Sequence, residues 1–228
     1  MNPHGERAYI STMTVVREVA LAGTADLAYW RERLRGEGLV PLDEDGRASL
    51  LLTAIESKFG GIPFRELSIS VLLQGGGAFL AHAFNSSRLL AFAERAFFQT
   101  PYHLAQLTVD ERHPVSIGVG RNGRDLFTAQ MGSERPPARR EDLIFDGPIY
   151  LPGGVKVFFA RLSGAADIFP FEAVDTATIT PDSSESIFRR LLESGFAGEE
   201  WRVRPGAVHA RTKTYHHDSR KTINQDIK

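Results

Sequence analysis

The chain of 228 residues contains no cysteine, and this absence excludes several kinds of site at once. Without thiols there can be no disulfide framework, no thiolate nucleophile and no zinc site with cysteine ligands. The seven histidines do not compensate, because His4, His216 and His217 lie near the chain ends and no HxxxH or HxH spacing falls on an expected helix or strand. We therefore expect no metal site.

An excess of one charge and long apolar runs are also missing. Lysine and arginine total 27 against 28 aspartates and glutamates, whereas nucleic-acid-binding proteins usually carry a basic excess. No stretch approaches the roughly 18 consecutive apolar residues that cross a bilayer. The first ten residues lack the apolar core of a secretory signal. The sequence thus predicts a cytoplasmic protein that binds neither nucleic acid nor membrane.

Familiar nucleotide-binding and nucleophile motifs are absent as well. The sequence has no GxSxG and no P-loop. The letters Gly118-x-Gly120-x-x-Gly123 match a dinucleotide-binding fingerprint, but the segment is predicted to form a strand and a hairpin turn and does not open a helix. We therefore expect no cofactor.

What the chain does have is a succession of short apolar stretches separated by turn residues. They predict about ten strands and three helices without regular strand–helix alternation, which favours a mostly antiparallel α+β fold. The clearest local signal is Asn122-Gly123 between two alternating runs, which is typical of a two-residue hairpin loop. Such a loop would place Val119 opposite Leu126.

One domain is expected over residues 1–210. At this length a single barrel or sandwich can bury a large core without disulfides or metals. From Arg211 to Lys228 the chain is polar and has no apolar periodicity, so residues 211–228 are predicted to form a disordered tail. The expected architecture is a curved or barrel-like β structure around a central small-molecule cavity.

Three stretches, in this order, resemble acetoacetate decarboxylase-like proteins. Residues 59–67 (FGGIPFREL) are similar to the glycine, aromatic, x, glutamate segment of that superfamily. Residues 84–100 resemble its helix-bearing stretch, and residues 100–105 (TPYHLA) occupy the place of its Pro-Lys-Lys motif. The resemblance covers about residues 13–162 and implies a curved antiparallel β structure around a cavity. We also expect a homodimer or a higher homo-oligomer.

One departure from the family motif bears directly on the chemistry. The decarboxylase lysine forms a Schiff base with the substrate ketone, and a neighbouring ammonium lowers its pKa. Tyr102 and His103 stand at these two positions, and neither can form an imine. Of the five lysines only Lys58 and Lys156 precede the expected tail, and Lys156 is expected to point outward from its strand. The sequence therefore predicts a divergent member that lacks the Schiff-base lysine.

A Glu, Tyr and His set remains as the candidate catalytic group. The resemblance places Glu66 where the family has a cavity glutamate, and a carboxylate in an apolar pocket can act as general acid or base. Tyr102 would donate a hydrogen bond to a carbonyl or enolate, and His103 would relay a proton. Only one of Tyr102 and His103 can face the cavity directly unless a bulge intervenes, because side chains alternate along a strand. The alternatives are a surface glutamate paired with an arginine and an ordinary strand histidine.

Five further side chains near these motifs are candidates for substrate contact: Phe64, Ser68, Phe97, Phe98 and Gln106. Ser68 shares the polar face of its strand with the candidate glutamate. The two adjacent phenylalanines would either line the mouth of a pocket or pack in a core.

The resulting hypothesis is an enzyme of secondary metabolism that acts on a keto acid, an enol or a polyketide-like intermediate. It would use acid–base chemistry without an imine, as a lyase or isomerase. Dehydration, cyclisation, isomerisation and retro-aldol cleavage all stay open. The alternative is a non-catalytic small-molecule-binding protein with the same fold. Converging ionisable groups on the cavity wall would favour the enzyme, and a wholly apolar lining would favour the binding protein.

Overall fold

The computed structural model describes residues 8–180 and 186–216 and has the predicted fold class, with a mostly antiparallel, barrel-like sheet and three α-helices. Within these ranges no helix is long and apolar enough to cross a bilayer. The helical segments are α1 (Leu27–Arg35), α2 (Arg88–Ala93), the π-helical η1 (Glu94–Phe98) and α3 (Ser186–Glu193). The strands are β1 (Ser11–Asp26), β2 (Asp43–Glu44), β3 (Arg47–Phe59), β4 (Ile62–Leu72), β5 (Ala78–Asn85), β6 (Tyr102–Leu104), β7 (Gln106–Asp110), β8 (Ser116–Arg121), β9 (Arg124–Gln130), β10 (Arg139–Leu151), β11 (Lys156–Pro170), β12 (Thr176–Ile179), β13 (Ala197–Arg211) and β14 (Tyr215–His216).

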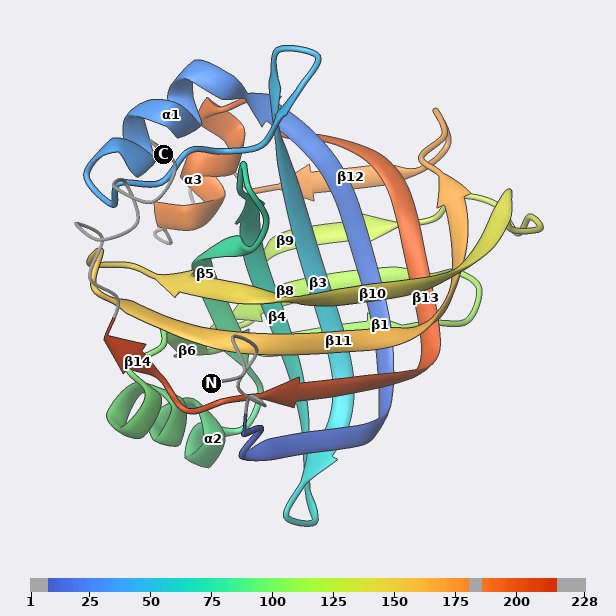
Figure 1. Cartoon of the computed structure of the whole chain (residues 1–228). Helices are drawn as coiled ribbons and strands as arrows, with labels where there is room; N and C mark the ends of the chain where they lie inside the picture. Colours follow the sequence, from blue (N-terminus) through green and yellow to red (C-terminus); the bar gives the residue numbers. More distant parts are fainter. Residues whose placement is uncertain (1–7, 181–185, 217–228) are drawn as a thin grey trace.

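Seven strands form a closed ring. Their order is β1-β13-β11-β10-β5-β4-β3, and β3 pairs back with β1. A second sheet, in the order β12-β9-β8-β7, packs on the outside of the ring together with α1 and α3. In Figure 1, β10 and β11 cross in front of β1, β3 and β4, and β8 and β9 lie behind them. The ring strands therefore have one side facing the second sheet and one side facing the barrel interior.

Alternation along the ring strands divides the side chains between these two sides. On β4, Leu67, Ile69 and Val71 are buried in the main core against the second sheet. Glu66 and Ser68 share the opposite face of β4, as predicted, and this face lies toward the barrel interior. The main core supplies most of the apolar burial, at roughly 1.5–3 kcal/mol for each fully buried large side chain. The interior is smaller and carries the polar groups.

The hairpin between β8 and β9 confirms the Asn122-Gly123 prediction. Both residues have positive φ, 54° and 74°, as a two-residue loop of this kind requires. The expected pairing of Val119 with Leu126 is wrong, because a bulge beside Val119 shifts the register and places it opposite Phe127. A bulge takes up one extra residue, so Leu126 and Phe127 are both buried.

The chain after residue 210 corrects the predicted domain boundary. Arg211 is the last residue of β13, Thr212 is fully buried, and β14 pairs with β11. The polar composition suggested disorder, but these polar groups have partners: Thr212 Oγ1 accepts a hydrogen bond from the Phe159 backbone N–H at 3.0 Å. Residues 211–216 thus belong to the folded domain. Residues 217–228 lie outside the described residues, and there the disorder stays a prediction.

Candidate functional site

Glu66 and Tyr102 meet in the barrel interior. Glu66 lies on β4, and Tyr102 begins β6, which pairs in parallel with β5. Ala83 of β5 lies opposite both Ser68 and Tyr102, and its small side chain lets the tyrosine ring pack over β5 toward β4. Tyr102 Oη donates a hydrogen bond of 2.5 Å to Glu66 Oε1. The structure therefore joins two of the three predicted catalytic side chains.

The surroundings of this pair shift both of its pKa values. Burial raises the pKa of Glu66 to about 7; the Glu94 carboxylate adds to this rise, and the Tyr102 hydrogen bond and Arg211 oppose it. Burial and the neighbouring carboxylates also raise the pKa of Tyr102 well above its usual value. At neutral pH Glu66 can therefore either give or take a proton, while Tyr102 stays a hydrogen-bond donor.

Arg211 and Glu94 form a second charged group beside the pair. Arg211 Nη1 donates to both carboxylate oxygens of Glu94 at 2.8 Å. The Thr100 hydroxyl donates to Glu94 Oε2, also at 2.8 Å. The guanidinium carbon lies 4.5 Å from the ring centroid of Phe98 and 4.3 Å from that of Phe158. Arg211 was not predicted to be a site residue, because its polar segment was expected to form the disordered tail.

A third charged group is buried on the same face of the ring. Glu18 on β1 accepts a 2.8 Å hydrogen bond from Arg204 Nε, and its other oxygen lies 2.6 Å from His209 Nε2. Burial acts to raise the pKa of Glu18, but His209 and Arg204 outweigh it, so this pKa lies below its usual value. No local motif marks this group, since its members come from the first and the last long strands.

The Glu66–Tyr102 pair and the Glu18 group lie on the same face of the ring, on either side of β3. Glu18 is paired with Ile55, and Ile55 is paired with Glu66. Because neighbouring strands are about 4.8 Å apart, the two glutamate Cα atoms are separated by about 10 Å. Ionisable groups thus converge on the barrel interior from β1, β4, β6 and β13, together with Glu94 of η1.

His103 lies apart from these groups. It faces away from Tyr102, and its ring stacks on that of His82 with centroids 4.6 Å apart and planes 13° from parallel. His82 in turn contacts Phe84, which belongs to the main core outside the ring. Of the two adjacent candidates only Tyr102 faces the interior, so the structure does not bring His103 to Glu66.

The predicted substrate-contact residues divide in the same way. Phe64 and Ser68 lie on the interior side of β4, and Ser68 Oγ donates to the Thr53 carbonyl at 3.4 Å. Phe98 is half-buried against the guanidinium described above. Phe97 is 74% exposed, and Gln106 is exposed on β7 of the second sheet. Neither of these last two is placed to contact a ligand inside the barrel.

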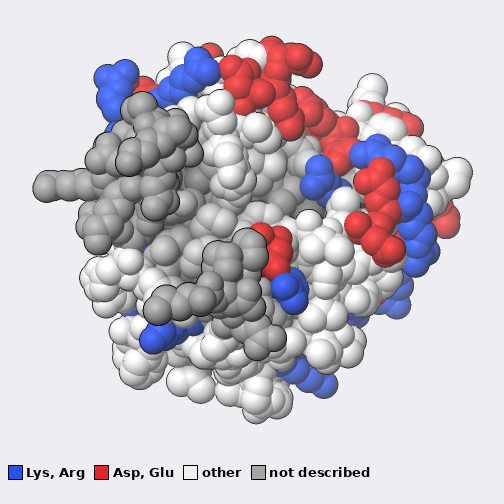
Figure 2. Space-filling view, in the orientation of Figure 1, with Lys and Arg blue, Asp and Glu red and all other residues white. Residues whose placement is uncertain are grey.

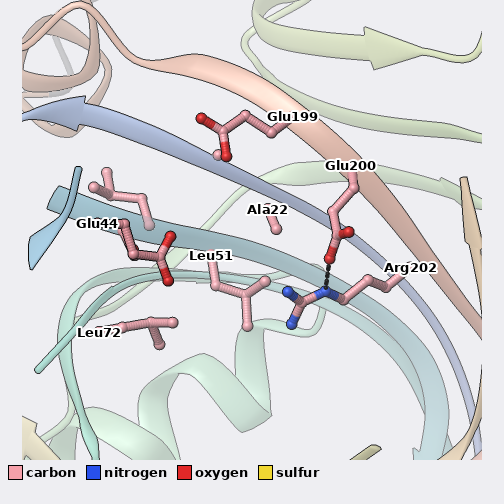
Figure 3. Close-up of a pocket in the computed structure, with 10 residues that line it drawn as sticks. Ala22, Glu44, Leu51, Leu72, Glu199, Glu200 and Arg202 are labelled. Atoms are coloured by element: carbon pink, nitrogen blue, oxygen red, sulfur yellow. Dashed lines mark hydrogen bonds and ion pairs between the residues drawn. The ribbon is translucent and has the colours of Figure 1, made fainter. Parts of the chain in front are cut away.

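A pocket of about 220 Å³ opens at the other end of the same interior face. Its wall includes Leu72, which lies on the same side of β4 as Glu66, six residues further along. Figure 3 shows the Arg202 side chain extending toward Leu51, with Arg202 Nε bonded to Glu200 at 2.7 Å. Acidic side chains gather on the surface toward this end, at the top of Figure 2.

No lysine of the described chain is among the groups that shift the pKa of Glu66 or Tyr102. Lys58 and Lys213 are exposed, and Lys156 is half-buried at the first position of β11, opposite His216. Among residues 8–180 and 186–216, no three histidine, aspartate or glutamate side chains are grouped as a metal ion requires. The chemistry available at the pair is therefore that of a carboxyl group and a phenol.

No protein-family model matches the chain, and no curated protein is similar to it. Solved structures are similar in fold. An acetoacetate decarboxylase-like enzyme from Sphingomonas wittichii RW1 matches with a TM-score of 0.58 and 14% identity, over 96% of this chain and 98% of that one. An acetoacetate decarboxylase matches with a TM-score of 0.58 and 13% identity, over 95% and 93%. The acetoacetate decarboxylase from Legionella pneumophila also matches at 0.58, with 14% identity, over 94% and 90%. The chain thus has the fold of the acetoacetate decarboxylase-like enzymes.

Proposed function

We propose that this protein is a small-molecule enzyme that acts on a keto acid, enol or polyketide-like intermediate by acid–base chemistry without an imine. The hydrogen bond between Tyr102 and Glu66 in the barrel interior is the observation that carries the proposal. It is supported by the pKa of Glu66, which burial raises to about 7. Two of the solved structures with this fold are of acetoacetate decarboxylases, and acetoacetate is a small keto acid, which agrees with this substrate class.

The proposed reaction starts with Glu66 as a base. Its carboxylate takes a proton from the carbon next to the substrate carbonyl, and the C–H electron pair moves to give an enolate. Tyr102 donates a hydrogen bond to the enolate oxygen and so stabilises its charge. Glu66 then returns the proton, either to another carbon, which isomerises the substrate, or to a departing hydroxyl, which leaves as water. Both outcomes balance without a co-reactant.

The absence of an imine rests on the residues at the motif and on where the lysines lie. By the family resemblance, Tyr102 and His103 stand at the place of the Pro-Lys-Lys motif. The lysines of the described chain are exposed or half-buried, whereas Glu66 is buried. Phe64 and Ser68 would form the wall beside the reacting pair. We give His103 no part in the chemistry, because its ring stacks on His82 and faces away from the barrel interior.

The interior favours the enzyme over a non-catalytic binding protein. A binding protein for an apolar ligand would have an apolar wall, and one cluster that includes Leu80, Ile149 and Phe158 does have this character. The other groups on the same face are charged, and a buried carboxyl with a pKa near neutrality is typical of an acid–base site.

Proton exchange tests the proposed reaction directly. Acetoacetate and pyruvate in D₂O would be followed by ¹H NMR for the loss of the protons next to the carbonyl. We expect the wild-type protein to accelerate exchange, and Glu66→Gln to lower the rate by about 100-fold or more, the usual size of a general-base contribution. Glu56→Gln on the neighbouring β3 is the matched control and should exchange like the wild type. Equal rates for wild type and Glu66→Gln would contradict the proposal.

A further inference from the structure

The guanidinium of Arg211 carries two buried donors without an acceptor. Nη1 is bonded to Glu94, but Nε and Nη2 have no hydrogen-bond partner within residues 8–180 and 186–216, and both atoms are buried. Buried donors of this kind are rare in folded proteins, because each one loses its bonds to water and gains nothing in return. Two such donors on one side chain therefore need an explanation.

The geometry of the guanidinium indicates which partner would fit. Nε and Nη2 lie on one edge of the planar group, and their parallel N–H bonds match the two oxygens of a carboxylate. The rings of Phe98 and Phe158 cover the guanidinium, so a hydrogen-bonding partner must approach in its plane. The Nη1 position is already occupied by Glu94. Nε and Nη2 therefore form one site that can donate two parallel hydrogen bonds to a carboxylate.

The Arg211 side chain lies close to the proposed reacting pair. Arg211 is paired with Ala160 of β11, and Ala160 packs in the same interior cluster as Tyr102. The charge of Arg211 acts on both Glu66 and Tyr102 and lowers the pKa of each. A small molecule whose carboxylate is bound to Arg211 would thus have its neighbouring carbons beside the pair.

We propose that the Nε–Nη2 edge of Arg211 binds the carboxylate of the substrate. This inference rests on the proposed function and narrows it: the substrate is a small keto acid, and a neutral ketone or polyketide would lack the group that this edge recognises. Arg211 would be a binding residue, and the proton transfer would remain with Glu66 and Tyr102.

Access to this edge requires movement of the surrounding protein, because both donors are buried. Two residues of η1 contact the guanidinium, Glu94 at Nη1 and Phe98 over one face. The segment Glu94–Phe98 is suited to such movement, since it is π-helical and none of its side chains is fully buried. It ends at Gln99, which has a left-handed φ of 57°. Short π-helical segments occur frequently at functional sites. The ion pair between Glu94 and Arg211 would hold η1 in place once a ligand is bound.

NMR of the arginine Nε–H groups tests the inference without any need for turnover. The wild-type protein would be titrated with acetoacetate and, separately, with acetoacetamide, which has the same shape and no charge. We expect acetoacetate to move the Arg211 Nε–H signal in a saturable way, and acetoacetamide to leave it in place. Arg211→Lys, which also assigns that signal, should weaken acetoacetate binding by about tenfold or more, because two charge-assisted hydrogen bonds are lost. Arg161→Lys, one strand away on the exposed side, is the control.

The outcomes separate this inference from the proposed function. If the Arg211 signal does not move, or if acetoacetamide binds as tightly as acetoacetate, the carboxylate site is wrong even where Glu66→Gln abolishes proton exchange. If acetoacetate binds at Arg211 and exchange does not depend on Glu66, the carboxylate site stands and the proposed chemistry fails. The titration of the wild type decides the question even if Arg211→Lys does not fold.

Discussion

Replacement of Glu66 by glutamine should make the protein more stable at alkaline pH. Glutamine has the size of glutamate, and its carbonyl oxygen can still accept the hydrogen bond from Tyr102. In the wild type, burial raises the pKa of Glu66 from 4.5 to about 7. Between these two pH values the folded protein keeps a proton that the unfolded chain has already released. The folded state is therefore penalised as the pH rises through this range.

The size of the effect follows from the two pKa values. At about 1.4 kcal/mol per pH unit, the interval from 4.5 to about 7 corresponds to a loss of about 3 kcal/mol of wild-type stability. Glu66→Gln has no such loss. The difference in unfolding free energy between variant and wild type should therefore grow in favour of the variant by about 3 kcal/mol between pH 4.5 and pH 8.

Urea unfolding at a series of pH values measures this difference. The fluorescence of Trp30 and Trp201 reports the transition, since both side chains are buried in the main core. Glu44→Gln, at the exposed β2 turn, controls for the change in net charge. A difference that stays constant with pH, or that shrinks, would refute the argument.

In Tyr102→Phe, ¹³C NMR of the Glu66 carboxyl should show a pKa above that of the wild type, because the phenol no longer stabilises the carboxylate.

Three further predictions concern the absence of an imine-forming lysine, the buried Glu18–Arg204 ion pair and the residues after Ala210. Borohydride reduction with acetoacetate should leave the mass of the protein unchanged, and a stable adduct on any lysine would overturn the reaction without an imine. Glu18→Gln should lower the unfolding free energy by about 3–5 kcal/mol, because the Arg204 guanidinium loses its buried counter-charge; a urea-unfolding loss under about 1 kcal/mol would argue against this. A chain that ends at Ala210 should melt more than about 5 °C below one that ends at His216, since it lacks the buried Thr212 and β14; equal melting temperatures in calorimetry would count against the new boundary.

The sequence alone determined the local features of this protein. The Asn122-Gly123 turn was predictable because a two-residue loop requires positive φ at both residues, and few other pairs adopt it. The opposite orientations of Glu66 and Leu67, and of Tyr102 and His103, follow from the alternation of side chains along a strand. The family resemblance added the pairing of Glu66 with Tyr102 at one site, and the structure shows these two side chains in contact.

Only the tertiary structure decided which distant strands pair and in what register. Glu18 and Arg204 are separated by 186 positions, and nothing near either residue in the sequence indicates the other. Arg211 lies in a polar segment whose order depends on partners from β11 and η1, so local composition predicted disorder there. Secondary-structure propensity and the alternation of side chains along a strand act over a few residues. The closure of a barrel, in contrast, depends on hydrogen bonds between strands far apart in the chain. The charged interior is a product of that closure.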